Sequence, residues 1–350
     1  MTNPTAFMQR PLFRTVGLVL AVGLAGFVPA ASAGYHLTHQ IPVGGPGGWD
    51  YLEADATARR LYVAHEDTVV VIDMDSLKVV GEVLNCPGMG GVALAPELNR
   101  GYTANGTDDT VTVFALDTLK PLARWKATGK RPNQILYESV TKRVFTFNST
   151  GRNATAFDAV TGEVLGTIPL DGRTEFPVAD GKGMIYDSLQ DKATVVAINA
   201  NTLRVTATYP LAPHADPAGT TMDPVTRRLF VACRSQSLVV LDADSGKILT
   251  TFPIGARNDA AKFDPGLKLI FASNGDGSLN ILREVSADKF FAVETVKTEF
   301  GARTMAVDPK THRLFLPSAD FDPVPSSTKD ATTARRTIRP GSFRILVLAP

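Results

Sequence analysis

Residues 221–255 read TMDPVTRRLFVACRSQSLVVLDADSGKILTTFPIG, and this stretch decides the fold. It holds an apolar segment ending at Met222 and three further apolar runs, at 229–233, 238–241 and 248–254, with polar turns between them. Asp-Pro and Asp-Ser-Gly in two of these turns suit tight reversals. The pattern predicts a four-stranded antiparallel meander. One such sheet buries too little apolar surface to offset chain entropy, so we expect further copies of it.

The second strand of this unit recurs along the whole chain. Its anchor position recurs seven times, at Leu61, Gly101, Val144, Met184, Leu229, Leu269 and Leu314. Successive positions are 40 to 45 residues apart, a period typical of propeller blades with four strands each. The third strand recurs as well, for example as VVVID at 69–73 and LVVLD at 238–242. The sequence therefore predicts an all-β fold, a seven-bladed β-propeller of four-stranded antiparallel blades.

The two ends of the repeat indicate how the ring closes. The last blade has its third strand at 343–348, and no fourth strand follows it. Residues 41–44 (IPVG) match the fourth-strand ending at 252–255 (FPIG). We therefore expect the N-terminal segment to supply the outer strand of the last blade, which removes an open sheet edge.

Residues 1–33 have the features of a secretory signal peptide. Arg10 and Arg14 form a basic region, residues 16–28 an apolar core, and Ala31-Ser32-Ala33 a cleavage site made of small residues. The apolar run is too short for a membrane span. The sequence predicts cleavage near Ala33, export to the periplasm or beyond, and one propeller over 34–350.

Charge and cysteine content exclude some classes of partner. The formal net charge is +1, and removing residues 1–33 takes out two arginines and no acid, which leaves −1. Such a protein has no global field to attract nucleic acid or an anionic membrane. Export permits a disulfide, but Cys86 and Cys233 belong to blades two and five, which are not neighbours in the ring, so we expect two unpaired thiols. We also expect a monomer.

The candidate site is the face where the between-blade loops and the loops joining strands two and three converge on the central channel. We predict a ligand-binding surface there. Its candidate residues are Trp49, Asp50, Arg131, Asn133, Glu175, Phe176, His214, Asp216, Arg257, Asn258, Asp259 and Arg303.

Two interpretations of the arginines remain open. Arg131, Arg257 and Arg303 could point inward as a funnel for a carboxylate, a phosphate or an acidic peptide. Alternatively, arginine and aspartate could pair across adjacent blades and brace the loops, as Arg257 and Asp259 suggest.

The sequence gives little support for metal or nucleophile chemistry. His214 and Cys233 border the same end of blade five and are weak candidates for a soft metal, but two ligands do not make a site. A metal-dependent propeller enzyme would need several channel-facing carboxylates, for which the pool is Glu66, Asp108, Glu175 and Asp216. No nucleophile elbow, HExxH motif or phosphate-binding glycine loop is present. We predict no cofactor.

One insertion interrupts the repeat. Residues 321–341 lie between strands two and three of blade seven and contain Pro323, Pro325 and Pro340 with a basic cluster of Lys329, Arg335, Arg336 and Arg339. The composition favours an irregular loop. It could act as a lid, as a docking arm for a partner, or as a plain surface insertion.

The repeat resembles the YVTN-type unit of the YncE-like propeller family. The resemblance rests on second strands such as RRLYVA and RRLFVA, third strands such as LVVLDADSGKILTTF and fourth-strand endings such as TFPIG. It covers residues 35–350 and implies a propeller of an exported bacterial protein. Gly48-Trp49-Asp50 and Arg257-Asn258-Asp259 depart from the usual Gly-x-x-Pro blade entry of the family.

The function we favour is an exported, non-catalytic binding or scaffold protein that recognises a small anionic ligand or a protein on the channel face. One alternative is a propeller enzyme, such as a metal-dependent lactonase or lyase or a quinoprotein-like enzyme. Another is single-stranded nucleic-acid binding, with Trp49 and Phe176 as stacking platforms beside the arginines, although the neutral net charge weighs against it.

Overall fold

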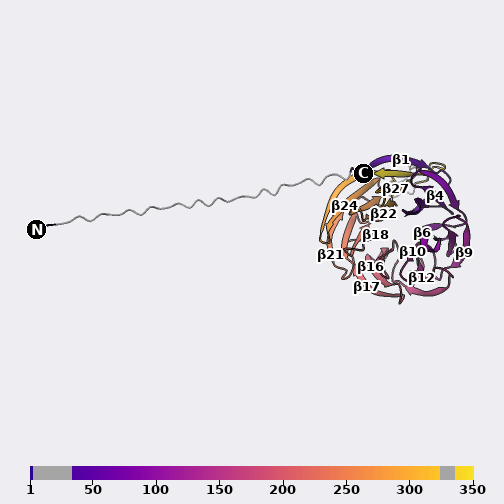
Figure 1. Cartoon of the computed structure of the whole chain (residues 1–350), viewed down its shortest axis with the longest axis horizontal. Helices are drawn as coiled ribbons and strands as arrows, with labels where there is room; N and C mark the ends of the chain where they lie inside the picture. The colour runs from indigo at the N-terminus through magenta and orange to yellow at the C-terminus, as the bar shows by residue number, and fades with distance from the viewer. Residues whose placement is uncertain (3–33, 324–335) are drawn as a thin grey trace. The chain divides into compact units, whose positions relative to one another are not determined.

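Seven four-stranded antiparallel sheets stand in a ring, in a computed structural model that describes residues 1–2, 34–323 and 336–350. Figure 1 shows inner strands such as β6, β10, β18 and β22 around the centre and outer strands such as β9, β17 and β21 on the rim. The seven-bladed propeller predicted from the repeat is confirmed. The expected signal peptide falls on residues 3–33, outside the described residues.

The blades follow one another along the chain, each from its inner to its outer strand. Blade one comprises β2 (Trp49–Asp55), β3 (Arg60–His65), β4 (Thr68–Asp73) and β5 (Lys78–Val83). Blade two comprises β6 (Met89–Ala95), β7 (Arg100–Asn105), β8 (Thr110–Ala115) and β9 (Pro121–Lys126), with the short 3-10 helix η1 (Pro96–Leu98). Blade three comprises β10 (Pro132–Glu138), β11 (Arg143–Asn148), β12 (Asn153–Asp158) and β13 (Val164–Pro169).

The remaining blades repeat this order, except that the outer strand of blade seven comes from the N-terminal segment. Blade four comprises β14 (Val178–Ala179), β15 (Met184–Leu189), β16 (Thr194–Asn199) and β17 (Arg204–Pro210), with η2 (Gln190–Lys192). Blade five comprises β18 (Pro217–Asp223), β19 (Arg228–Cys233), β20 (Ser237–Asp242) and β21 (Ile248–Pro253). Blade six comprises β22 (Asn258–Asp264), β23 (Leu269–Asn274), β24 (Ser278–Ser286) and β25 (Lys289–Lys297). Blade seven comprises β26 (Ala306–Asp308), β27 (Arg313–Ser318), β28 (Arg344–Ala349) and β1 (His36–Pro42).

The unbroken apolar runs follow from the position of each blade between two others. Successive side chains of a strand point to opposite faces of the sheet. In β3, Leu61 and Val63 pack toward blade seven, whereas Tyr62 and Ala64 pack toward blade two. Because both faces of the sheet are covered, both sets are buried. Each large side chain buried in this way contributes about 1.5–3 kcal/mol.

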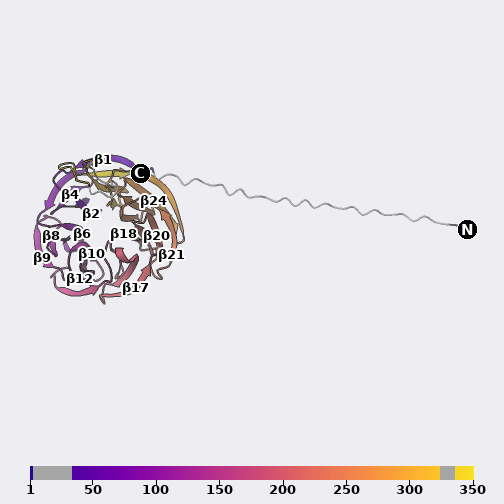
Figure 2. The same ribbon diagram turned by 180° about the vertical axis from the view of Figure 1, so that it is seen from behind.

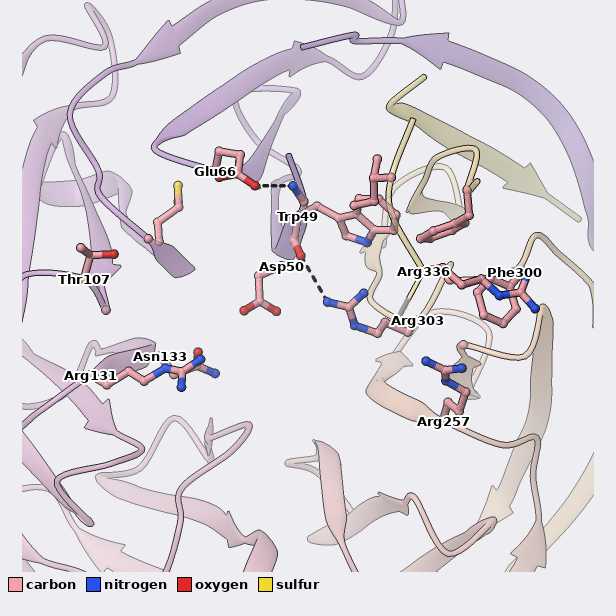
Figure 3. Close-up of a pocket in the computed structure, with 18 residues that line it drawn as sticks. Trp49, Asp50, Glu66, Thr107, Arg131, Asn133, Arg257, Phe300, Arg303 and Arg336 are labelled. Atoms are coloured by element: carbon pink, nitrogen blue, oxygen red, sulfur yellow. Dashed lines mark hydrogen bonds between the residues drawn. The ribbon is translucent and has the colours of Figure 1, made fainter. Parts of the chain in front are cut away.

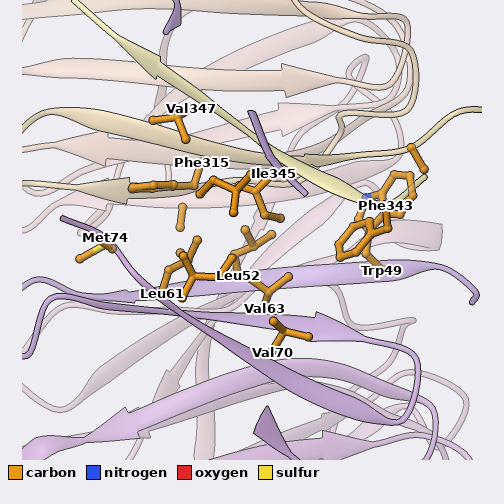
Figure 4. Close-up of a cluster of buried hydrophobic side chains, with 14 residues drawn as sticks. Trp49, Leu52, Leu61, Val63, Val70, Met74, Phe315, Phe343, Ile345 and Val347 are labelled. Atoms are coloured by element: carbon orange, nitrogen blue, oxygen red, sulfur yellow. The ribbon is translucent and has the colours of Figure 1, made fainter. Parts of the chain in front are cut away.

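The predicted closure of the ring by the N-terminal strand is also confirmed. β1 pairs antiparallel with β28, and Ile41 stands opposite Ile345 in that pairing. The apolar cluster between blades seven and one then continues the ring of cores (Figure 4). Its buried members are Ile41, Trp49, Leu52, Leu61, Val63, Val70, Ile72, Met74, Ala306, Phe315, Ala319, Phe343, Ile345 and Val347.

The arginine before the second-strand anchor links neighbouring blades. Arg60 donates to the carbonyl of Leu116 in the next blade, and the same position of later blades repeats this contact. The repeats are Arg100 to Ala159 and Val160, Arg143 to Ala200 and Asn201, Arg228 to Ala287, and Arg313 to Met74. The arginine directly before the anchor in the RRL and KRV motifs is therefore structural. It lies at the face opposite the between-blade loops.

Small residues allow neighbouring inner strands to approach each other; Figure 2 shows β2, β6, β10 and β18 around the centre of the ring. A Cβ atom on Gly219 of β18 would stand 2.3 Å from the backbone nitrogen of Ala261 in β22. A Cβ atom on Gly90 of β6 would stand 2.0 Å from the carbonyl oxygen of Asn133. Real side chains cannot approach backbone so closely, so only glycine at these positions allows the neighbouring inner strands to come this near.

Two further observations bear on the composition of the chain. Cys86 and Cys233 are free and buried in the apolar clusters between blades. Among the residues that the structure describes, no helix has the length and apolar character needed to cross a membrane.

Candidate functional site

A cavity of about 630 Å³ opens at the end of the channel where the between-blade loops converge. We call it the channel pocket (Figure 3). Blades one, two, three, six and seven supply its walls, which are formed by Gly48, Trp49, Asp50, Glu66, Gly88, Met89, Gly106, Thr107, Arg131, Asn133, Arg257, Gly275, Phe300, Gly301, Arg303, Phe321, Arg336 and Ile338. Its size is that of a site for a small organic ligand.

Three exposed arginines stand at the rim of the channel pocket. They are Arg131, Arg257 and Arg336. Within residues 34–323 and 336–350, no carboxylate forms an ion pair with any of them. Arg336 lies 4.2 Å and Arg257 5.2 Å from the ring centroid of Phe300, so cation–π contacts position both guanidinium groups.

The backbone fixes the position of Arg131 on the other side of the pocket. Arg131 adopts a left-handed backbone conformation with φ of 56°, and its backbone N–H donates to Asp109 Oδ1 at 2.8 Å. The loop is thereby tied down while the guanidinium remains unpaired among the described residues. All three rim arginines therefore keep donors available for an incoming anion.

Arg303 has a different role from the rim arginines. Its Nε donates to Asp259 Oδ2 at 2.8 Å, and its Nη2 donates to the carbonyl of Trp49 at 3.3 Å. Arg234 donates to the other carboxylate oxygen of Asp259. Asp259 thus joins the loops of three blades. The bracing interpretation fits Arg303, whereas Arg257 does not pair with Asp259 as the sequence had suggested.

Asp50 presents the one carboxylate in the pocket wall that has no partner within the described residues. Glu66, the other acid of the wall, accepts a hydrogen bond from the backbone N–H of Gly48. Burial in the channel raises the pKa of Asp50 well above its usual range, and the nearby charge of Arg303 only partly offsets this effect.

Two further carboxyl groups lie deeper, on blade four. Glu175 is almost fully buried, with Arg173 Nη2 at 3.4 Å from its Oε1. Burial, with repulsion from Asp259, raises the pKa of Glu175 to about 7. Asp187 is fully buried, and burial with repulsion from Glu175 raises its pKa well above the usual range. The sequence did not single out Asp187, because it sits in an ordinary second strand.

Glu175 leads to a prediction on pH. Its native pKa lies above the ordinary value of 4.5, so the native state holds this proton more tightly than the unfolded chain does. The resulting stability is complete below about pH 4.5 and is lost as pH rises through about 7. Between about pH 5 and about pH 8 we expect the melting temperature of the wild type to fall by roughly 5 °C more than that of Glu175→Gln. Parallel pH profiles in differential scanning calorimetry that do not differ would contradict this.

A second cavity of about 230 Å³ lies further along the inner strands, toward the opposite face. Phe176 lines it and meets the ring of Tyr51 edge-on at 5.0 Å. Lys262 Nζ covers Phe176 at 4.8 Å from the ring centroid. Phe176 is therefore part of the channel interior and does not line the channel pocket.

Of the remaining predicted residues, some line the channel pocket and others are buried in the blades or lie outside it. Trp49 is buried and stacks on Phe343 at 5.4 Å, so only part of it reaches the pocket wall. Asn258 is buried and donates to the carbonyl of Ser273 at 2.8 Å. His214 and the exposed Asp216 lie on blade five and outside the pocket.

The metal candidates do not form a cluster. His214 Nδ1 is 2.9 Å from Ser237 Oγ, while Cys233 is buried in the core between blades four and five. Asp108 of the carboxylate pool is paired with Arg124 at 2.6 Å. In the part of the chain that the structure describes, no group of three or more His, Cys, Asp and Glu side chains has a geometry that could hold a metal ion.

The ends of the blade-seven insertion contribute to the site. Phe321 and Ile338 form an isolated antiparallel bridge, and both line the channel pocket together with Arg336. Arg339 Nε lies 3.7 Å from Asp322 Oδ1. The central part of the insertion, with Pro325, Lys329 and Arg335, lies outside the described residues.

Comparison with known proteins supports the fold alone. No family model matches the chain, and no curated protein matches its sequence. Among solved structures, hydrazine synthase of Kuenenia stuttgartiensis is similar, with a TM-score of 0.67 and 16% identity over 80% of this chain and 94% of that one. At this level of identity the similarity concerns the propeller architecture and not the activity.

Proposed function

We propose that this protein is an exported binding protein of the YncE-like type, whose channel pocket recognises a small anionic ligand without catalysis. The observation that carries the proposal is the group of three exposed guanidinium groups, Arg131, Arg257 and Arg336, around one pocket of about 630 Å³. Guanidinium groups recognise carboxylates and phosphates through paired, charge-assisted hydrogen bonds. The features of residues 1–33 support export.

The charge balance of the wall favours an anion over a cation. Arg303 and Arg234 offset Asp259 through their direct contacts. Asp50 is the one carboxylate of the wall that no described residue pairs, and it faces three guanidinium groups that carry no ion pair within the described residues. What remains at the rim is the positive charge of the three arginines, which lie on loops held by the rigid ring.

Titration calorimetry of the purified protein tests this proposal with a panel of small anions. The panel comprises acetate, phosphate, succinate, citrate and pyrophosphate, at low and at physiological ionic strength. We expect saturable one-to-one binding of at least one multivalent anion, with an affinity that falls as salt screens the rim. If none of these anions binds at millimolar concentration in low salt, the proposal is wrong.

A further inference from the structure

Asp50 lies in the wall of the channel pocket, between Arg131 on one side and Arg257 and Arg336 on the other. Figure 3 shows its carboxylate pointing into the open space, with Arg131 and Asn133 on one side and Arg257, Arg303 and Arg336 on the other. The backbone there is fixed, because Thr304 Oγ1 donates to the carbonyl of Asp50 at 2.7 Å. This hydrogen bond from blade seven holds the backbone of Asp50 in place, so its side chain faces the cavity.

The neighbouring cation is not available to neutralise Asp50. Arg303 directs its Nε to Asp259 and its Nη2 to the carbonyl of Trp49, and its guanidinium lies 5.7 Å from the ring centroid of Trp49. Within the described residues no side chain or backbone N–H donates a hydrogen bond to the Asp50 carboxylate. A hydrogen bond to this carboxylate must therefore come from solvent or from a ligand.

A ligand that fills the pocket must replace that solvent. A purely anionic ligand would leave Asp50 desolvated and close to like charge, which costs free energy. A ligand with a cationic group would instead donate charge-assisted hydrogen bonds to Asp50. The rim arginines at the same time require an anionic group.

We infer that the ligand of the channel pocket is a zwitterion, with a carboxylate for Arg131, Arg257 or Arg336 and an ammonium group for Asp50. This inference rests on the proposed function and narrows it to one ligand class, that of amino acids and short peptides. A cavity of about 630 Å³ has room for a peptide of a few residues, within the usual range for small-ligand sites.

Three peptides of equal backbone length test the inference in titrations of the purified protein. Triglycine carries both charges, N-acetyl-triglycine carries only the carboxylate, and triglycine amide carries only the ammonium group. One charge-assisted hydrogen bond corresponds to about 10- to 100-fold in affinity. We expect triglycine to bind at least about tenfold more tightly than either derivative.

Two variants identify the residue responsible. Asp50→Asn should reduce the affinity for triglycine to that for N-acetyl-triglycine and leave the latter unchanged. Asp216→Asn is the matched control, because Asp216 is an exposed carboxylate between blades four and five that does not line the pocket. It removes the same charge and should change neither affinity.

The possible results separate this inference from the proposed function. Equal binding of triglycine and N-acetyl-triglycine would overturn the zwitterion and leave anion binding intact. The same holds if none of the three peptides binds while an anion of the calorimetric panel does. Failure of the peptides and of the whole anion panel would overturn both proposals.

Discussion

Replacing Arg131, Arg257 and Arg336 together by Gln is expected to weaken the binding of a multivalent anion that contacts all three by about a thousandfold, while the melting temperature stays nearly unchanged. Each guanidinium that reaches the ligand contributes a charge-assisted hydrogen bond, and the loss of one costs about tenfold in affinity. Stability should not change, because these side chains are exposed and carry no ion pair among the described residues. Titration calorimetry and thermal unfolding measure the two quantities.

Two controls show whether the effect is local. A second triple variant, with Gln at Arg204, Arg283 and Lys78, removes the same charge from exposed positions outside the pocket and should retain binding. Arg303→Gln should instead lower the melting temperature, because it leaves buried Asp259 with one of its two partners. A rim variant that unfolds, or that binds anions as well as the wild type, would contradict the assignment.

Deleting residues 34–43 is expected to abolish most of the stability of the ring. The deletion removes β1, exposes the edge of β28, and takes away two buried anchors, Tyr35 and Ile41. Tyr35 packs edge-on against Phe271 with 5.2 Å between ring centroids, and its hydroxyl donates to the carbonyl of His312 at 2.7 Å.

The two buried anchors set the size of this effect. Removing one buried Ile or aromatic side chain costs about 2–5 kcal/mol, whereas whole domains are stable by only about 5–15 kcal/mol. We therefore expect the deletion variant to be aggregated or largely unfolded in urea titrations and size-exclusion chromatography. Loss of the ring closure also exposes an unpaired strand edge, which favours association.

A point variant and a peptide provide the controls for the deletion. Leu37 lies on the same strand with its side chain exposed, so Leu37→Ala should change stability by less than about 0.5 kcal/mol. A synthetic peptide with the sequence of residues 34–43 should restore part of the stability when added to the deletion variant. A deletion variant that unfolds at the same urea concentration as the wild type would show that β1 does not hold the ring.

The repeat made the fold predictable from the sequence. Leu61 and its equivalents mark the second strands, because packing between two blades requires apolar contact there; at Gly101 the ring of Phe114 fills the space of the missing side chain. Ile41 identified the closing strand for the same reason, since it repeats the fourth-strand ending of other blades. Such positions carry the same pattern in each repeat, and this recurrence can be read from the sequence.

The composition of the channel pocket was only partly predictable. Trp49, Asp50, Arg131, Arg257 and Arg303 follow from the rule that between-blade loops meet at the channel. Glu175, Phe176, His214 and Asp216 satisfy the same rule and lie elsewhere, because the pocket draws on the loops of five blades and leaves out those of blades four and five. Which loops reach the pocket depends on their three-dimensional course, and the spacing of the repeats does not predict that course.

The roles of individual residues were harder still to predict. The sequence presents Arg257 and Arg303 as equivalent, but Arg303 is paired with Asp259 and Arg257 lies against Phe300. Arg336 comes from the insertion, which has no counterpart in the repeat, and Phe300 lies in the same between-blade loop as Arg303 without any signal in the sequence that marks it as a pocket residue. Asp50 lacks a hydrogen-bond partner within the described residues because Arg303 donates to Asp259 and to the carbonyl of Trp49. These pairings can be seen only in the folded chain.

The most direct test of the anion-binding pocket is native mass spectrometry of the wild type and of the Arg131, Arg257 and Arg336 variant, purified in parallel under mild conditions and then supplied with the anion panel. We predict one anionic small molecule per wild-type chain, whether carried through purification or bound from the panel, and none on the variant. An anion that stays on the variant with equal occupancy, or a wild type that holds no anion at all, would contradict it.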